Sequence, residues 1–332
     1  MKSKERSPEP VDVTIGKAAH SQQAASDLPH GAAARGMSSE RRPVALKRLA
    51  LFLFCGLYGL ALSGCAAALN AITPAGGYTL VSNIAYAPGD RRVLDLYLPN
   101  AMTAKTPVVV FIHGGSWDTG SKDIYPFVGQ SLASAGFIVA IPNYRLYPET
   151  RFPGFVEDGA KAVSVVDRLA SEGRDGIPRG RHPLFLMGHS AGAEIAGLLA
   201  TDKRYLAAAG SSISRLAGFI GLSGPYDFLP LTDERYKRIF PEPTRQASQP
   251  VNFVDGDEPP TLLIAGADDT TVDPKNTRSM AAKLMAAGIP VKETIYPGIA
   301  HIGTISSFST VLPLGNRAIR EEVIRFVRGR AG

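Results

Sequence analysis

The chain has 332 residues, with 36 basic and 30 acidic side chains and a formal net charge of +6. This length is sufficient for one large domain with additional segments. Residues 1–64 hold 9 basic and 5 acidic residues, which leaves 27 and 25 for the rest of the chain. So small an excess of positive charge after residue 64 excludes a basic surface of the kind that binds nucleic acid.

The N-terminal part has the composition of an export signal. Residues 1–40 are rich in Ser, Ala, Pro and charge, which predicts a disordered extension. A basic segment and an apolar stretch from Leu49 to Leu62 follow, and this pattern over 41–64 predicts a secretory signal peptide. The apolar stretch is shorter than the roughly 20 residues that span a bilayer. Because the signal begins far from residue 1, translation could instead start at Met37; the alternative is an extension that slows or blocks export.

The signal ends in Leu-Ser-Gly-Cys, which resembles the bacterial lipobox. The resemblance implies that Cys65 carries lipid, that 65–79 is a linker, and that the protein is anchored in the cell envelope. Ala66 in the next position implies the outer membrane, in a Gram-negative host. The alternative is that Cys65 is one of several small residues after an apolar stretch. Cys55 lies within the signal, so the mature domain is expected to have no disulfide.

From about residue 80 onward, strand and helix patterns alternate along the chain. The sequence predicts strands at 80–87, 91–98, 107–112, 137–141, 183–187, 217–222, 260–265 and 291–296, and helices at 121–135, 154–172, 191–203, 275–288 and 316–329. Two antiparallel strands followed by this alternation predict an α/β domain over 80–332, with a mostly parallel sheet of about eight strands covered by helices on both faces. Residues 223–259 interrupt the alternation and form either a partial lid or a surface excursion.

The most specific motif is Gly188-His189-Ser190-Ala191-Gly192. It stands between the apolar strand 183–187 and a helix that starts at residue 191. Strand, sharp turn and helix around G-x-S-x-G are typical of a nucleophile elbow. The turn strains the serine backbone and exposes its Oγ, so Ser190 is the candidate nucleophile.

A second motif, His113-Gly114-Gly115-Ser116-Trp117, follows the strand 107–112. An H-G-G-x turn upstream of the elbow is typical of an oxyanion hole. We expect the N–H groups of Gly115 and Ala191 to bind the oxyanion, with Gly114 as a further donor. Ser116 and Trp117 are candidate pocket residues, although Trp117 could equally pack in the core.

A serine nucleophile needs a base and an acid that orients it, in the chain order Ser, acid, His. Among the six histidines, only His301 follows Ser190, in what we expect to be a loop. Asp268 and Asp269 follow the buried strand 260–265, where catalytic groups collect at the carboxyl ends of parallel strands. Either is the candidate acid; Asp227 is the second choice, with turn capping its preferred role.

These motifs together resemble α/β-hydrolases of the esterase/lipase type, close to the hormone-sensitive-lipase-like and the acetyl- and feruloyl-esterase-like carboxylesterases. The segments that carry the resemblance are 113–117, 143–149, 152–153, Asp158, the elbow, the Gly-x-x-Asp-x-x-Val frame at 266–272 and His301. The resemblance covers about 78–329 and implies that Asp269 is the acid. Tyr144 and Arg145 are expected to pack and pair rather than to touch substrate. Two features depart from lipase-like members: Ser116 replaces a third glycine, and no N-terminal cap precedes the first strand.

The resemblance implies a serine carboxylesterase that works through an acyl-enzyme and needs no metal or other cofactor. With the cap missing and 223–259 polar, we expect short-chain esters of small molecules as substrates. The H-G-G-x-W motif also resembles that of kynurenine-formamidase-like hydrolases. An arylformamidase, or another amidase or peptidase, is therefore the alternative. A non-catalytic envelope binding protein is the last alternative, and the complete triad argues against it. The sequence gives no prediction of oligomeric state.

Overall fold

The structure is a computed structural model that describes residues 69–331. The predicted extension at 1–40, the signal peptide at 41–64, the lipid site at Cys65 and the alternative start at Met37 all lie outside the described residues. None of the helices between residues 69 and 331 has the length and apolar character needed to cross a membrane.

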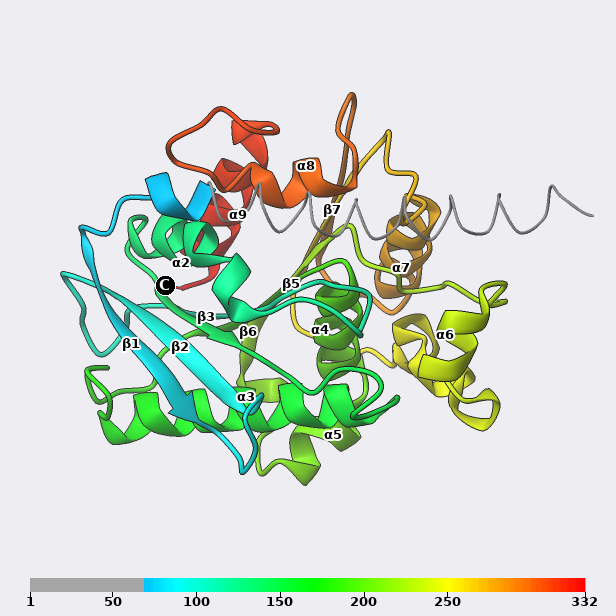
Figure 1. The fold of residues 1–332 in the computed structure, drawn as a ribbon, viewed down its shortest axis with the longest axis horizontal. Coiled ribbons are helices and arrows are strands. Elements are labelled where there is room, and N and C mark those ends of the chain that lie inside the picture. The colour runs from blue at the N-terminus through cyan, green and yellow to red at the C-terminus, as the bar shows by residue number, and fades with distance from the viewer. Residues whose placement is uncertain (1–68, 332) are drawn as a thin grey trace, which may run out of the picture. The chain divides into compact units, whose positions relative to one another are not determined.

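A single eight-stranded sheet forms the centre of the fold (Figure 1). Its strands are β1 (Tyr78–Ala85), β2 (Val93–Pro99), β3 (Val108–Ile112), β4 (Ile138–Pro142), β5 (Leu184–His189), β6 (Leu216–Leu222), β7 (Thr261–Gly266) and β8 (Val291–Tyr296). Their order is β1-β2-β4-β3-β5-β6-β7-β8. Strand β2 is antiparallel to both of its neighbours, and every other pair is parallel. This confirms the predicted α/β-hydrolase fold.

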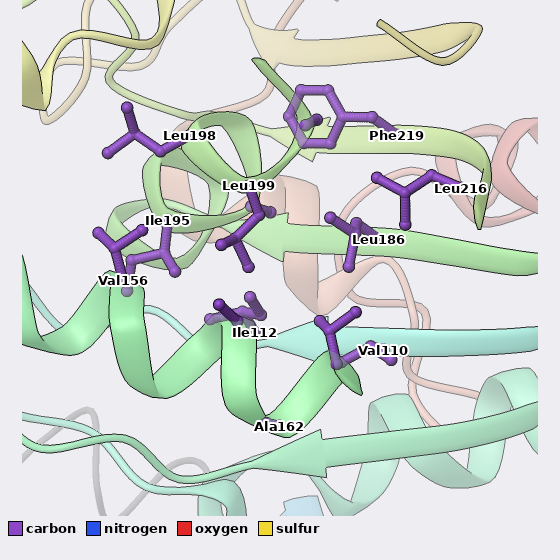
Figure 2. Close-up of a cluster of buried hydrophobic side chains, with 14 of the residues drawn as sticks. Val110, Ile112, Val156, Ala162, Leu186, Ile195, Leu198, Leu199, Leu216 and Phe219 are labelled. Atoms are coloured by element: carbon purple, nitrogen blue, oxygen red, sulfur yellow. The ribbon is translucent and has the colours of Figure 1, made fainter. Parts of the chain in front are cut away.

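Helices cover both faces of the sheet because its central strands are apolar on both sides. The α-helices are α2 (Pro126–Ala133), α3 (Gly154–Glu172), α4 (Ala191–Thr201), α5 (Lys203–Ala208), α6 (Glu234–Ile239), α7 (Lys275–Ala286), α8 (His301–Ser306) and α9 (Arg317–Arg330). Along β3, Val108, Val110 and Ile112 pack toward α3, α4 and α7, while Val109 and Phe111 pack toward α2 and α9. Figure 2 shows the first of these two clusters, where α3 and α4 pack against β3 and β5.

The helix expected over 121–135 is split in two. A single 3₁₀ turn, η1 (Lys122–Ile124), precedes α2, which begins at Pro126. Proline has no N–H to donate and is favoured at the start of a helix, so it marks a new beginning. The structure also corrects the expectation that His301 lies in a loop, because it is the first residue of α8.

Residues 223–259 contain α6 and the three 3₁₀ turns η3 (Glu242–Thr244), η4 (Gln246–Ser248) and η5 (Pro250–Phe253). Tyr226, Ile239 and Phe240 are fully buried. The segment therefore has an apolar inner side that belongs to the core, beneath an exposed polar outer side.

Candidate active site

The sharp turn after β5 raises Ser190 above the sheet edge. Its φ of 55° and ψ of −127° lie in a region that non-glycine residues rarely adopt. The flanking glycines leave no room for larger residues: a Cβ on Gly188 would lie 2.2 Å from the Gly192 carbonyl oxygen, and one on Gly192 would lie 2.1 Å from that of Ile112. The Ser190 amide donates to the Leu222 carbonyl of β6 at 2.9 Å, which fixes the turn to the sheet.

Ser190, His301 and Asp269 form one hydrogen-bonded chain. The distance from Ser190 Oγ to His301 Nε2 is 2.9 Å, and that from His301 Nδ1 to Asp269 Oδ2 is 2.8 Å. Asp269 follows β7 and His301 follows β8, so the parallel strands bring both to the edge where β5 ends. The three residues proposed from the sequence are thus brought together.

The carboxylate of Asp269 is held in place from both of its oxygens. While Oδ2 faces His301, Oδ1 accepts the backbone N–H groups of Thr271 and Val272 at 3.0 and 2.9 Å. Burial by itself raises the pKa of Asp269, but the hydrogen bond and the charge of His301 outweigh it, and the net pKa lies below its ordinary value. An ionised Asp269 can only accept, so the proton on His301 lies on Nδ1 and leaves Nε2 free to accept from Ser190.

The competing aspartates lie elsewhere. Asp268 is exposed, and its backbone amide donates to the Ile299 carbonyl. Asp227 is exposed as well, and its carboxylate accepts a hydrogen bond from Ser279 on α7. In the region that the structure describes, neither forms a hydrogen bond with His301, whereas Asp269 does.

The turn after β3 presents free amides beside Ser190. Gly115 has φ of 131°, and its carbonyl accepts the amides of Asp118 and Thr119, which closes a tight loop. A Cβ on Gly114 would lie 3.1 Å from the Ser190 Cβ, so the backbone of this turn passes directly over the nucleophile. The amide of Gly114 faces the Tyr125 hydroxyl, whereas within residues 69–331 the amides of Gly115 and Ala191 donate to no protein acceptor. They are free to bind an oxyanion.

His113 and Tyr144 pack against each other and hold the turn after β3 in place. The rings stack with centroids 4.4 Å apart, and the Tyr144 hydroxyl donates to the His113 carbonyl at 2.9 Å. Burial lowers the pKa of His113 to about 4, so its ring is neutral. Arg145 pairs with the buried Asp158 through two guanidinium nitrogens. Tyr144 and Arg145 therefore pack and pair as expected.

Of the two candidate pocket residues, Ser116 is partly exposed with φ of 52°, whereas Trp117 is buried. The Trp117 ring lies edge-on to Phe240, with centroids 4.7 Å apart, and also packs on Phe228 and Tyr236 of the segment 223–259. Trp117 thus takes the second of its two expected roles, packing in the core.

The sequence analysis missed Glu194, which is fully buried in the first turn of α4. Its Oε2 accepts the Trp117 Nε1–H at 3.0 Å, and its Oε1 has no partner among the described residues. Burial raises the pKa of Glu194 well above its ordinary value. The signal in the sequence is one acidic residue within an otherwise apolar helix, next to the elbow.

His189 is the second residue of the site that the sequence motifs did not predict. Its ring packs against that of His301 with centroids 4.9 Å apart, and its Nε2 lies 3.3 Å from the His301 carbonyl. Burial, with a smaller contribution from the charge of His301, lowers the pKa of His189 to about 3. It is therefore a neutral ring that donates to the His301 backbone and positions that residue.

Comparison with known proteins gives relatives of the same type. Probable isoprenylcysteine alpha-carbonyl methylesterase ICMEL1 from Arabidopsis thaliana is 31% identical over 243 residues, which is 66% of this chain and 50% of that protein. Kynurenine formamidase from Salmo salar is 30% identical over 152 residues, 45% of this chain and 47% of that one. The chain spans about half the length of the curated relatives it matches.

The fold is shared with esterase B from Lactobacillus rhamnosis, whose structure was solved with a tributyrin phosphonate inhibitor. The TM-score is 0.70 at 19% identity, covering 85% of this chain and 96% of the other. The BD-FAE family model matches residues 94–284, more than half of the chain. This stretch includes the elbow and the H-G-G-x-W turn. The sequence therefore belongs to the BD-FAE family, on an α/β-hydrolase fold.

Proposed function

We propose that this protein is a serine carboxylesterase that hydrolyses short-chain esters through an acyl-enzyme. The observation that carries the proposal is the unbroken chain from Ser190 Oγ through His301 to Asp269, beside free amides in the H-G-G-x turn. A nucleophile, a base, an orienting acid and oxyanion donors are the groups that acyl transfer requires.

In the proposed reaction, Ser190 Oγ attacks the acyl carbon while His301 Nε2 takes its proton. Asp269 holds the Nδ1–H tautomer and stabilises the imidazolium. The amides of Gly115 and Ala191 bind the developing oxyanion, each donor contributing ~10²–10³ in rate. His301 then protonates the departing alcohol, and water attacks the acyl-enzyme by the reverse of these steps.

Two observations support a short acyl group. The aromatic side chains around Trp117 fill the space between the oxyanion turn and the segment 223–259, and Trp117 itself is only 5% exposed. The fold neighbour from Lactobacillus rhamnosis was solved with a C4-C4 phosphonate and with a C6-C4 inhibitor, both with short chains. The second candidate function is arylformamidase activity, which the kynurenine formamidase relative favours.

A panel of p-nitrophenyl esters from C2 to C12, kept below their micellar threshold, tests the substrate class, and N-formylkynurenine tests the alternative. We expect kcat/KM to peak between acetyl and butyryl and to fall by dodecanoyl, because methylenes that protrude from the site contribute little of the ~0.8 kcal/mol that a buried one does. A rise that continues through C8 to C12 would replace this proposal with a lipase. Faster turnover of N-formylkynurenine than of every ester would replace it with a formamidase.

Ser190→Ala tests the nucleophile. We expect kcat to fall by about 10⁴–10⁶ and labelling by a fluorophosphonate probe to disappear. Ser171→Ala, at an exposed serine on α3, is the matched control and should keep both activity and labelling. A Ser190→Ala protein that still takes the label would remove the assignment.

We also propose that Cys65 carries the lipid anchor and that the protein resides in the cell envelope, at the outer membrane. Metabolic labelling with a fatty acid tests this: the wild-type chain should incorporate the label and Cys65→Ser should not. An unlabelled wild-type chain would contradict the anchor.

A further inference from the structure

The surface beside α9 carries more basic than acidic side chains. This helix has five arginines, and within residues 69–331 the one ion pair that they form joins Arg325 to Glu321 at 3.9 Å. Arg320 instead donates to Ser131, from Nε to the hydroxyl at 2.6 Å and from Nη2 to the carbonyl at 2.9 Å, which leaves Nη1 for a further acceptor. Arg317 is exposed with no acidic partner in that part of the chain. The start of α9 therefore presents two arginines, Arg317 and Arg320, that form no ion pair within residues 69–331, with Glu321 beside them.

A hollow of about 230 Å³ lies beside these arginines. It is lined by Ser309, Thr310, Arg317, Arg320 and Glu321. Guanidinium and hydroxyl groups around one hollow provide the donors that a phosphate oxygen accepts from. The single carboxylate, Glu321, faces Arg325 as well.

Next to this hollow, the segment between α8 and α9 exposes large apolar side chains. Val311, Leu312 and Leu314 are each 39–40% exposed, and Ile302 on α8 is 44% exposed. We name residues 311–314 the apolar loop. Together with Ser309 and Thr310, which line the hollow, the loop forms a continuous run of chain, so the apolar and basic surfaces adjoin.

The apolar loop follows the C-terminal end of α8. Gly315 packs on α8 so closely that a Cβ there would lie 2.4 Å from the Gly303 carbonyl oxygen. His301 is the first residue of that helix, and in Figure 1 the segment between α8 and α9 loops back beside α8. A surface on which this loop rested would therefore lie on the side of the molecule that carries α8.

The described chain begins on the same side. The Asn70 side chain donates to the carbonyls of Asp123 and Ile124, just before α2, and Thr310 donates to Gln130 on α2. Cys65 precedes Leu69 by four residues, so it can lie no more than about 14 Å from it. A lipid on Cys65 would enter a bilayer near the apolar loop.

We propose that the apolar loop and the start of α9 dock on a bilayer that contains anionic phospholipids. The hollow takes a headgroup phosphate between Arg317 and Arg320, and Val311, Leu312 and Leu314 enter the acyl boundary. Basic and apolar side chains in one patch are typical of surfaces that bind in the membrane interface. The active site then faces esters that partition into that membrane.

The test uses the full chain with vesicles of phosphatidylcholine, alone or with 30 mol% phosphatidylglycerol. Hydrogen exchange read by mass spectrometry reports which segment the lipid covers. We expect protection of residues 307–320 on anionic vesicles, lost at high salt. Each arginine near such a surface contributes about 5-fold in binding, so Arg317→Glu/Arg320→Glu should weaken that protection by about 30-fold in lipid concentration or more.

Three further variants complete the experiment. Arg317→Glu alone changes an exposed side chain that forms no hydrogen bond within residues 69–331, and should weaken the protection even if the double variant unfolds. Val311→Ser/Leu312→Ser/Leu314→Ser should abolish the protection on all vesicles. Arg174→Glu/Arg181→Glu, at the opposite edge of the sheet, is the matched control and should leave the protection unchanged.

Circular dichroism melting checks that each variant is folded, independently of catalysis. Equal protection on neutral and anionic vesicles, or protection that survives both the single and the double change at the start of α9, would overturn the proposal. So would equal loss in the control at residues 174 and 181. Hydrolysis of soluble p-nitrophenyl acetate should not change in any of these variants. The docking proposal is therefore tested by hydrogen exchange and the esterase proposal by hydrolysis, and either can be wrong without the other.

Discussion

Glu194 is a buried carboxyl group with one hydrogen bond, and its proton should control stability. It is fully buried, it accepts from Trp117, and its other oxygen has no partner among the described residues. Burial raises its pKa well above the ordinary value, which favours the neutral acid in the folded protein. Glu194→Gln replaces this acid with an amide of the same shape, whose carbonyl can still accept from Trp117 and which cannot ionise.

The sign of the effect follows from the proton balance. Above about pH 4.5 the unfolded chain has lost the Glu194 proton, and the folded chain still keeps it. The folded state then binds more protons, so the free energy of unfolding of the wild type falls by up to about 1.4 kcal/mol for each pH unit, until the folded-state pKa is reached. Glutamine carries no such dependence. Glu194→Gln should therefore gain stability relative to wild type as the pH rises.

Urea unfolding at pH 5, 6, 7 and 8 measures this difference. Between pH 5 and 7 the variant should gain steadily on the wild type as the pH rises, at an unchanged m-value. Glu157→Gln, at an exposed glutamate on α3, is the matched control and should show a flat difference. The reasoning would be refuted if the difference in unfolding free energy between Glu194→Gln and wild type did not change with pH, or if the wild type became the more stable of the two as the pH rises. Either result would mean that Glu194 is ionised in the folded protein.

Two further predictions concern the site and the core around it. Asp269→Asn should lower kcat for p-nitrophenyl butyrate by about 10⁴, because asparagine favours the wrong imidazole tautomer, whereas Asp268→Asn should lower kcat no more than a few-fold. A larger loss of kcat in Asp268→Asn than in Asp269→Asn would assign the acid to Asp268. If both variants stay active, the acid is Asp227. Phe240→Ala should lower the free energy of unfolding by about 3–5 kcal/mol in urea titrations, because the ring is fully buried against Trp117, and a loss below 1 kcal/mol would show that the cluster closes around the cavity.

The elements that the sequence predicts well are those with a local signal. The run Val108–Ile112 is buried on both sides, and a continuous apolar stretch of that length predicts a central parallel strand. The order Ser, acid, His then left His301 as the single candidate base. The ends of β7 and β8 and the elbow after β5 place Asp269, His301 and Ser190 at one edge of the sheet, because the carboxyl ends of parallel strands lie together.

The elements that the sequence did not predict depend on contacts between distant segments. The helices α5, α6 and α8 have six residues each, too few for an apolar period to appear. Glu194 has the position of a solvent-exposed acid that favours a helix N-terminus, and only the packing of Trp117 and of the segment 223–259 buries it. Trp117 itself could be assigned to the core only once Phe240 was known to lie on it.

The last prediction concerns the link between the oxyanion turn and the segment 223–259. Asp118 directly follows Trp117, and both of its carboxylate oxygens accept from the guanidinium of Arg235 on α6, 117 residues further along the chain. The arginine is 41% and the aspartate 15% exposed, so solvent screens the pair in part, and we expect it to contribute about 1 kcal/mol to stability. The same contact restrains the turn whose amides face Ser190.

A double-mutant cycle with Asp118→Asn and Arg235→Gln separates the pair from its surroundings. Each single change should lower kcat/KM for p-nitrophenyl butyrate a few-fold, mainly through kcat, because a looser turn places the oxyanion donors less accurately. The double variant should lose no more than either single one. Additive losses would mean that the two side chains act independently, and unchanged kcat/KM with lowered stability would confine the pair to a structural role. The first alternative would leave the aromatic contacts of Trp117 as the link between the segment 223–259 and the oxyanion turn.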